Sequence, residues 1–316
     1  MGYQVERRPR PLARQTARFP VHRSLCVTPS TPLFPPTYTG GMSVSLPRLA
    51  FLGTGKMGGA ILRGVRRPGV DVAGIRATTR TEQAAELLRA DGVEAQSLEV
   101  NHQANVWAVE EADVAILGVK PPYIVDLASS VSDHLADGAV VVSVAAGITT
   151  EQIEHVVSQP VVRSMPNTPS QIGLGVTGVA AGSRATSDHL QVVSDVFSQV
   201  GDVVVVDEDQ INALSAISGS GPAYVFYLAE KLMHLAVAKG FSVDQAKVMV
   251  EGTLLGASSL LHQSTDSAEE LRRAVTSPGG TTEQAIGVFD NRDAAGILEE
   301  ALTRALARAE EMAKGS

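Results

Sequence analysis

Apolar residues along this chain follow two different patterns, and the change falls near residue 207. Before that point, short unbroken apolar runs alternate with segments of mixed polarity, as in a parallel sheet that helices cover on both faces. The runs lie at 48–52, 72–77, 113–119, 139–147 and 202–207. This pattern predicts an α/β fold with a Rossmann-type parallel-sheet domain over residues 48–207.

Beyond residue 207, apolar residues recur three and four positions apart, which is the period of a helix. One predicted helix covers 223–239 and stops at Gly240. Ser242 and Gln245 form a capping box that begins another helix, which runs to about residue 262. Small residues crowd these helices and aromatic residues are few, which favours packing against a second subunit. We therefore predict an all-α C-terminal dimerisation domain over 208–316.

Residues 1–47 are predicted to lie outside both domains. The first 41 residues contain seven prolines and no hydrophobic period, and they carry six arginines against one glutamate. Three interpretations stay open: a disordered extension, a targeting segment, or an overlong reading frame whose true start is Met42. The sole cysteine, Cys26, belongs to this segment. A folded part without cysteine fits a reducing compartment, and we expect a cytoplasmic protein.

The composition narrows the possible functions. With 316 residues, of which 44% are hydrophobic, the chain is long enough for two domains with their own cores. A net charge of −8 argues against binding to nucleic acid, and no apolar run approaches the length of a membrane span. The seven histidines show no paired spacing, so no metal site is expected.

A glycine motif follows the first apolar run directly. Gly53, Gly55 and Gly58 have the spacing G-x-G-x-x-G, and a helical pattern comes next. In this context the first glycine makes a tight turn, the second admits a pyrophosphate, and the third lets helix and strand approach. The motif predicts a dinucleotide contacted by Gly53, Thr54, Gly55, Lys56, Met57 and Gly58.

The end of the second apolar run indicates which dinucleotide is bound. An NAD-specific site would place an acidic residue there to hold the ribose 2′-hydroxyl, but this chain has Arg80 among threonines. A guanidinium suits a 2′-phosphate, so we predict NADPH, with NADH as the alternative. The loops after the next two runs should line the same cleft, because ligands bind at the carboxyl ends of parallel strands. Their residues are Val119, Lys120, Pro121, Ala145 and Ala146.

The segment 275–282 reads as an anion-binding turn at the start of a helix. Pro278 fixes one φ angle, Gly279 and Gly280 permit conformations closed to other residues, and the first N–H groups of the helix then face a ligand. An ordinary capped Pro-Gly turn is the plain alternative. We predict a carboxylate site whose residues are Ser277, Gly279, Gly280, Thr281 and Thr282.

Five motifs in order give the chain a family resemblance. Residues 48–314 resemble pyrroline-5-carboxylate reductases, whose motifs are matched at 53–58, 119–121, 163–169, 218–224 and 275–282. The resemblance implies reduction of L-Δ1-pyrroline-5-carboxylate to L-proline by NAD(P)H, the last step of proline biosynthesis, in a homodimer or a higher homo-oligomer. A Rossmann-type imine or β-hydroxyacid reductase, and a non-enzymatic NADPH-binding protein, are the alternatives.

The resemblance also assigns roles to single residues. The family binds the substrate carboxylate through backbone amides of the turn and brings a threonine hydroxyl to the ring nitrogen, roles that fall on Gly280, Thr281 and Thr282. Thr282 is thereby the expected catalytic residue. Asn105, which stands 15 residues before Lys120, matches the family's cofactor-side asparagine. Asn167, from the third motif, is also assigned to the cofactor site.

Overall fold

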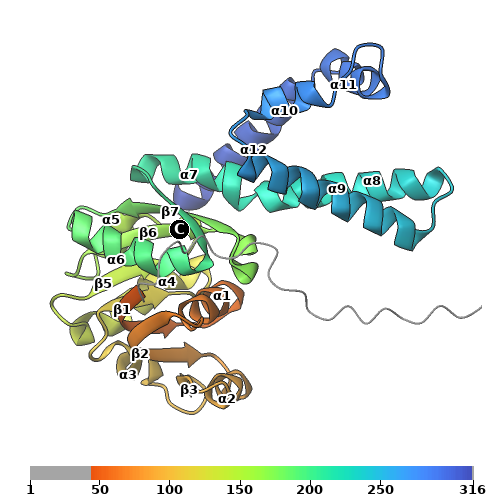
Figure 1. Cartoon of the computed structure of the whole chain (residues 1–316). Helices are drawn as coiled ribbons and strands as arrows, with labels where there is room; N and C mark the ends of the chain where they lie inside the picture. Colours follow the sequence, from red (N-terminus) through yellow and green to blue (C-terminus); the bar gives the residue numbers. More distant parts are fainter. Residues whose placement is uncertain (1–43, 315–316) are drawn as a thin grey trace, which may run out of the picture. The chain divides into compact units, whose positions relative to one another are not determined.

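The computed structural model describes residues 44–314, so the predictions for residues 1–43 lie outside it. Eight strands form one sheet in the order β3-β2-β1-β4-β5-β6-β7-β8 (Figure 1). All neighbouring strands are parallel except β6 and β7, which are antiparallel. The strands are β1 Val44–Leu52, β2 Val70–Thr79, β3 Glu94–Ser97, β4 Val114–Leu117, β5 Val140–Ser143, β6 Val161–Pro166, β7 Gly175–Ala181 and β8 Gly201–Val205.

The first strand begins earlier than the sequence predicts. Residues 44–47 were assigned to the extension, but they belong to β1, where Val44 pairs with Val70 of β2 and Leu46 is buried. Pro47 does not stop the strand, and the apolar side chain at position 46 packs into the same core as Leu49. The strand therefore includes four residues that the prediction placed in the extension.

Both faces of the sheet are buried, which explains the unbroken apolar runs. Successive side chains of a strand point to opposite faces. Phe51 accordingly belongs to one core cluster with Ile61, whereas Leu52 belongs to a second cluster with Ile124. The helices that cover the sheet are α1 Lys56–Val65, α2 Glu82–Ala90, α3 Ala104–Val109, α4 Ile124–Val131, α5 Thr150–Glu154 and α6 Ser187–Phe197.

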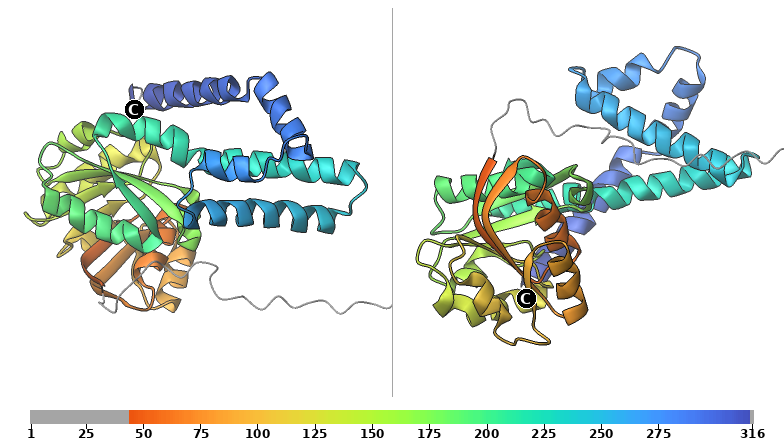
Figure 2. Two further views of the ribbon diagram at one scale, coloured as in Figure 1. Left: turned by 45° about the horizontal axis from the view of Figure 1, so that its top comes forward. Right: turned by 60° about the horizontal axis from the view of Figure 1, so that its bottom comes forward.

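The remaining chain is helical, as predicted. The Ser242 hydroxyl caps α9 by accepting a hydrogen bond from the Gln245 amide, and the Gln245 side chain accepts one from the Ser242 amide. Helices α8 and α9 lie side by side (Figure 2), and α12 packs against α7 and the π turn Ser215–Gly219. The elements are α7 Ile211–Leu214, α8 Gly221–Ala238, α9 Val243–Gln263, α10 Ala268–Ala274, α11 Thr281–Asn291 and α12 Ala294–Lys314. No helix in the range 44–314 combines the length and the apolar character that a bilayer span requires.

Candidate active site

The glycine turn after β1 has the geometry that a dinucleotide needs. Gly53 has φ of 85°, and a Cβ at this position would lie 2.6 Å from the Val119 side chain, so only glycine fits. Gly58 lets α1 approach the turn, since its Cβ would lie 3.3 Å from the Gly53 carbonyl oxygen. At Gly55 a Cβ would meet nothing within 4 Å, and no side chain caps the helix that starts there. The N-terminal amides of α1, from Lys56 and Met57 onward, are therefore open to a phosphate.

Thr78, at the end of β2, holds this turn in place. Its buried hydroxyl accepts a hydrogen bond from the Gly53 amide at 3.1 Å and lies 2.8 Å from Asn105 Oδ1. The Thr54 amide and hydroxyl both donate to the Thr78 carbonyl oxygen, at 2.9 and 3.0 Å. Asn105 is thus tied to the glycine turn through Thr78.

The other predicted cofactor loops follow β4, which neighbours β1, and β5, which neighbours β4. Val119, Lys120 and Pro121 come after β4, and Ala145 and Ala146 come after β5. Because β1, β4 and β5 are parallel, their carboxyl ends meet at one edge of the sheet. The structure therefore brings these five residues to the same edge as the glycine turn.

Arg80 directly follows β2 at this edge, and its side chain is exposed. A carboxylate that the sequence analysis missed lies at the helix that comes next: Glu99 accepts a hydrogen bond from the Glu82 amide at 2.8 Å, at the first residue of α2. The Ser97 hydroxyl and Arg89 hold the pKa of the Glu82 carboxyl below its usual value. Glu99 is 17 residues from Glu82 in sequence and follows β3, so the contact forms only when β3 is in its place in the sheet.

Asn167 differs from the other predicted cofactor residues. Its side chain is buried, donates to the carbonyl and hydroxyl oxygens of Ser218 at 3.1 and 3.2 Å, and accepts from the Val176 amide at 2.9 Å. The carboxamide is therefore engaged within the protein on both its oxygen and its nitrogen.

The predicted anion-binding turn connects α10 to α11. Gly279 has φ of 72°, a left-handed conformation that favours glycine, and the Gly280 amide donates to the Ser277 carbonyl oxygen at 3.0 Å. Gly280 is the N-cap of α11, and no side chain caps this helix. The helix therefore begins with the amides of Thr281 and Thr282. Thr281 is exposed and Thr282 is half-buried. In the described chain, the hydrogen bonds of this turn all stay within residues 272–284.

The turn already holds a carboxylate of its own chain. The Gly279 amide donates to Glu283 Oε2 at 2.8 Å. This contact was not predicted, and it indicates that the Gly279 amide is accessible to an anion. A substrate carboxylate at this amide would have to displace Glu283.

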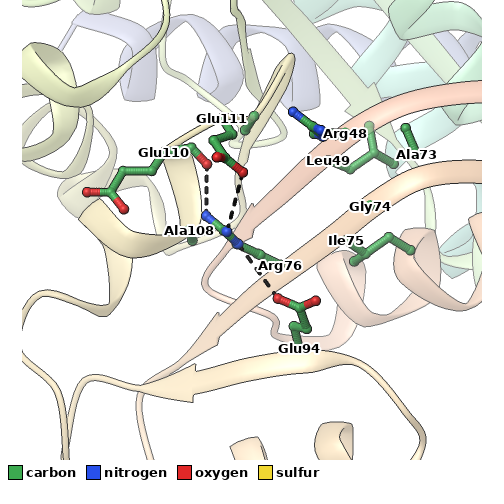
Figure 3. Close-up of a pocket in the computed structure, with 11 residues that line it drawn as sticks. Arg48, Leu49, Ala73, Gly74, Ile75, Arg76, Glu94, Ala108, Glu110 and Glu111 are labelled. Atoms are coloured by element: carbon green, nitrogen blue, oxygen red, sulfur yellow. Dashed lines mark hydrogen bonds and ion pairs between the residues drawn. The ribbon is translucent and has the colours of Figure 1, made fainter.

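The pocket drawn in Figure 3 lies away from all of these residues. It has a volume of about 150 Å³, and Arg76 spans it between Glu94 at 3.7 Å and Glu111 at 3.6 Å. Arg76 Nη1 also donates to the carbonyl oxygens of Trp107 and Glu110, both at 2.9 Å. None of the predicted site residues lines this pocket.

Comparison with known proteins finds matches for both parts of the chain. Residues 208–312 match the family model for pyrroline-5-carboxylate reductase dimerisation, and residues 48–147 match that for F420-dependent NADP oxidoreductases. The chain is 35% identical to a pyrroline-5-carboxylate reductase of Pseudomonas aeruginosa over 275 residues, which are 86% of this chain and 98% of the relative. It is 36% identical to one of Corynebacterium melassecola over 272 residues, which are 84% and 98% of the two chains.

The chain belongs to the pyrroline-5-carboxylate reductase family. The solved reductase of Coxiella burnetii agrees in structure as well, with 35% identity, a TM-score of 0.77, and coverage of 85% of this chain and 98% of that one. A Plasmodium falciparum reductase solved with NADP bound shares the fold at 22% identity and a TM-score of 0.72, covering 87% of this chain and all of its own.

The helices matched by the dimerisation model expose large apolar side chains. No residue of α8 is buried, although Phe226, Tyr227 and Leu228 are large and apolar. Beside them, α8 and α9 enclose a groove of about 500 Å³ with a mostly apolar lining that includes Met233 and Leu254. A patch of this kind marks a protein interface, and the matched dimerisation model covers it.

Proposed function

We propose that this chain reduces L-Δ1-pyrroline-5-carboxylate to L-proline with NADPH. The observation that carries the proposal is 35% identity to a pyrroline-5-carboxylate reductase over 86% of the chain, with the glycine turn and the anion-binding turn both intact. The open face of Gly55 fits a pyrophosphate. Exposed Arg80, where an NAD-specific site would have an acid, supports NADPH over NADH.

For this reaction the protein has chiefly to align the nicotinamide with the imine and to bind the substrate carboxylate. When bound, NADPH supplies a hydride to the imine carbon, and the ring nitrogen is, or becomes, protonated. The turn at 277–282 holds the substrate carboxylate through its amides, and the Thr282 hydroxyl donates toward the ring nitrogen or relays a proton from water. A threonine hydroxyl is too weak an acid to be the proton source itself.

The working enzyme in this proposal is a homodimer or a higher homo-oligomer in the cytoplasm. A second copy covers the exposed apolar side chains of α8, and the turn of one subunit meets the cofactor edge of its neighbour. Two observations support the composite site: the matched dimerisation model, and a turn whose described hydrogen bonds are all local.

A steady-state assay tests the proposed reaction. The full chain is mixed with pyrroline-5-carboxylate and either NADPH or NADH, and loss of the reduced cofactor is followed together with formation of proline. We expect turnover with both cofactors and a higher kcat/KM with NADPH. Turnover of a β-hydroxyacid with NADP⁺, without reduction of pyrroline-5-carboxylate, would favour the alternative reductase class.

Replacing Arg80 tests the cofactor preference. Arg80→Ala should raise the KM for NADPH about tenfold, because a charge-assisted bond to the 2′-phosphate is lost, and leave the KM for NADH within about twofold. Arg80→Lys keeps the charge without the forked donors. Its KM for NADPH should lie between those of the unaltered protein and Arg80→Ala. An equal loss with both cofactors would contradict a 2′-phosphate contact at this residue.

Replacing Glu283 tests whether the turn binds the substrate carboxylate. Glu283→Gln removes a negative charge that accepts from the Gly279 amide, so the KM for pyrroline-5-carboxylate should fall about twofold to fivefold. Asp290→Asn makes the same charge change near the other end of α11 and should leave this KM unchanged. A rise in KM for Glu283→Gln would indicate that Glu283 orders the turn instead of competing with the substrate.

A further inference from the structure

Two buried side chains of one segment reach from the sheet to the first turns of the dimerisation domain. Both belong to the motif 163–169, which the sequence assigned to the cofactor site through Asn167. Arg163 lies in β6, and Asn167 follows the last residue of that strand. Their exposed fractions are 3% and 7%, so neither side chain is a surface group.

Arg163 holds the segment that enters α7. Its Nη2 donates to Asn212 Oδ1 at 2.9 Å, and its Nη1 lies 3.5 Å from Glu208 Oε1. Glu208 in turn accepts from the amide of Thr150 at 2.7 Å and from its hydroxyl. Arg163, Glu208 and Thr150 thus join β6, the residues before α7, and the start of α5.

Asn167 holds the π turn that connects α7 to α8. In that turn the Ser220 amide bonds to the Ser215 carbonyl oxygen, five residues back. Two side chains also donate to carbonyl groups of this turn. Asn167 donates to the Ser218 carbonyl oxygen at 3.1 Å, and the Tyr224 hydroxyl donates to that of Ala216 at 3.0 Å. π turns are rare and occur often at functional positions.

The burial of Arg163 is not explained by stability alone. Arg163 is buried and Glu208 is half-buried, and pairing a buried guanidinium gains little over an apolar side chain of similar volume, because the guanidinium loses its hydration. Within the described residues, Arg163 Nε has no hydrogen-bond partner, which adds to that cost. Burial lowers the pKa of the guanidinium, and the charge of Glu208 opposes this effect. What the pair does provide is one defined geometry between β6 and the residues before α7.

We propose that Arg163 and Asn167 are positioning residues that fix the root of the dimerisation domain, residues 208–219, against the sheet. The proposal rests on the proposed function. Because α8 begins directly after this root, the root sets where α8 lies relative to the cofactor edge. In a dimer that forms through α8, the root thereby determines the position of the partner's substrate turn relative to this cofactor edge. Asn167 is accordingly reassigned from cofactor contact to positioning.

Variants of the full chain test this assignment. Arg163→Met and Asn167→Ala should lower kcat at least tenfold, leave the Kd for NADPH within about twofold, and speed hydrogen exchange of the amides at 211–221. Arg184→Met is the control for loss of an arginine: Arg184 is exposed, and its guanidinium bonds to carbonyl oxygens of the sheet domain only, at Glu154, Val157 and Gln159. It should leave kcat within about twofold and exchange at 211–221 unchanged.

The outcomes separate this proposal from the proposed reaction. A weaker Kd for NADPH in Asn167→Ala, in proportion to the loss of kcat, would make Asn167 a cofactor contact and overturn the assignment. Unchanged exchange at 211–221 in both variants would also overturn it. If Arg163→Met fails to fold, Asn212→Ala removes only the neutral acceptor and should show the same pattern more weakly. The exchange measurement holds even if the unaltered chain does not reduce pyrroline-5-carboxylate, because it needs no substrate.

Discussion

Thr282→Ala should lower kcat/KM for pyrroline-5-carboxylate by about one to two orders of magnitude, equivalent to about 1.5–3 kcal/mol. The variant loses the hydroxyl that donates toward the ring nitrogen, whereas the backbone amides of the turn stay in place. The Kd for NADPH should not change. Stopped-flow reduction and cofactor titration measure the two quantities separately.

A second threonine in the same segment provides the control. The Thr276 hydroxyl donates to the Arg272 carbonyl oxygen, so Thr276→Ala removes a hydroxyl that is already engaged within the chain. Its kcat/KM should stay within about threefold of the unaltered protein, since the lost bond is a local one. Wild-type kcat/KM in Thr282→Ala would contradict the catalytic role given to that hydroxyl.

Phe226→Asp should abolish self-association and at least nine-tenths of the activity together. The exposed fraction of Phe226 in the single chain is 67%, and a carboxylate there would be buried in the proposed interface without a partner. Leu87→Asp is matched, because Leu87 is 66% exposed on α2 of the sheet domain. It should keep both oligomer and activity. Light scattering and the reduction assay measure the two properties on the same samples.

Mixed oligomers decide whether one site draws on two subunits. Gly55→Val fills the open space at the glycine turn and should block the pyrophosphate, whereas Thr282→Ala damages only the substrate turn. When the two variants are co-assembled, some sites combine an intact cofactor edge with an intact turn, so activity should reappear. Co-assembly without restored activity would place both halves of the site in one subunit.

The features that could be predicted from sequence are those set by local pattern. The glycine spacing at 53–58 predicts the turn with positive φ at Gly53, and Ser242 with Gln245 predicts the cap of α9. These features need only a few neighbouring residues, so periodicity and capping chemistry reveal them. The strand 175–181 was missed, because its small residues and two glycines give no strand signal.

The contacts that were missed depend on residues far apart in the chain. The sequence assigns Asn167 to the cofactor site, but its side chain donates to the carbonyl oxygen of Ser218 in the π turn, 51 residues away. Glu99 reaches the start of α2 only because β3 pairs with β2. Glu283 is near Gly279 in sequence, but the sequence does not show which way the Glu283 side chain points. Its contact with the Gly279 amide is therefore visible only in the structure.

Isotope transfer tests the central claim most directly. The full chain is given pyrroline-5-carboxylate and NADPH that carries deuterium on the reactive face of the nicotinamide, and the product is analysed by mass spectrometry. We predict L-proline with one deuterium on the former imine carbon, formed in equal amount to the NADPH consumed. Consumption of NADPH without labelled proline, or no consumption at all by the folded oligomer, would contradict the assignment.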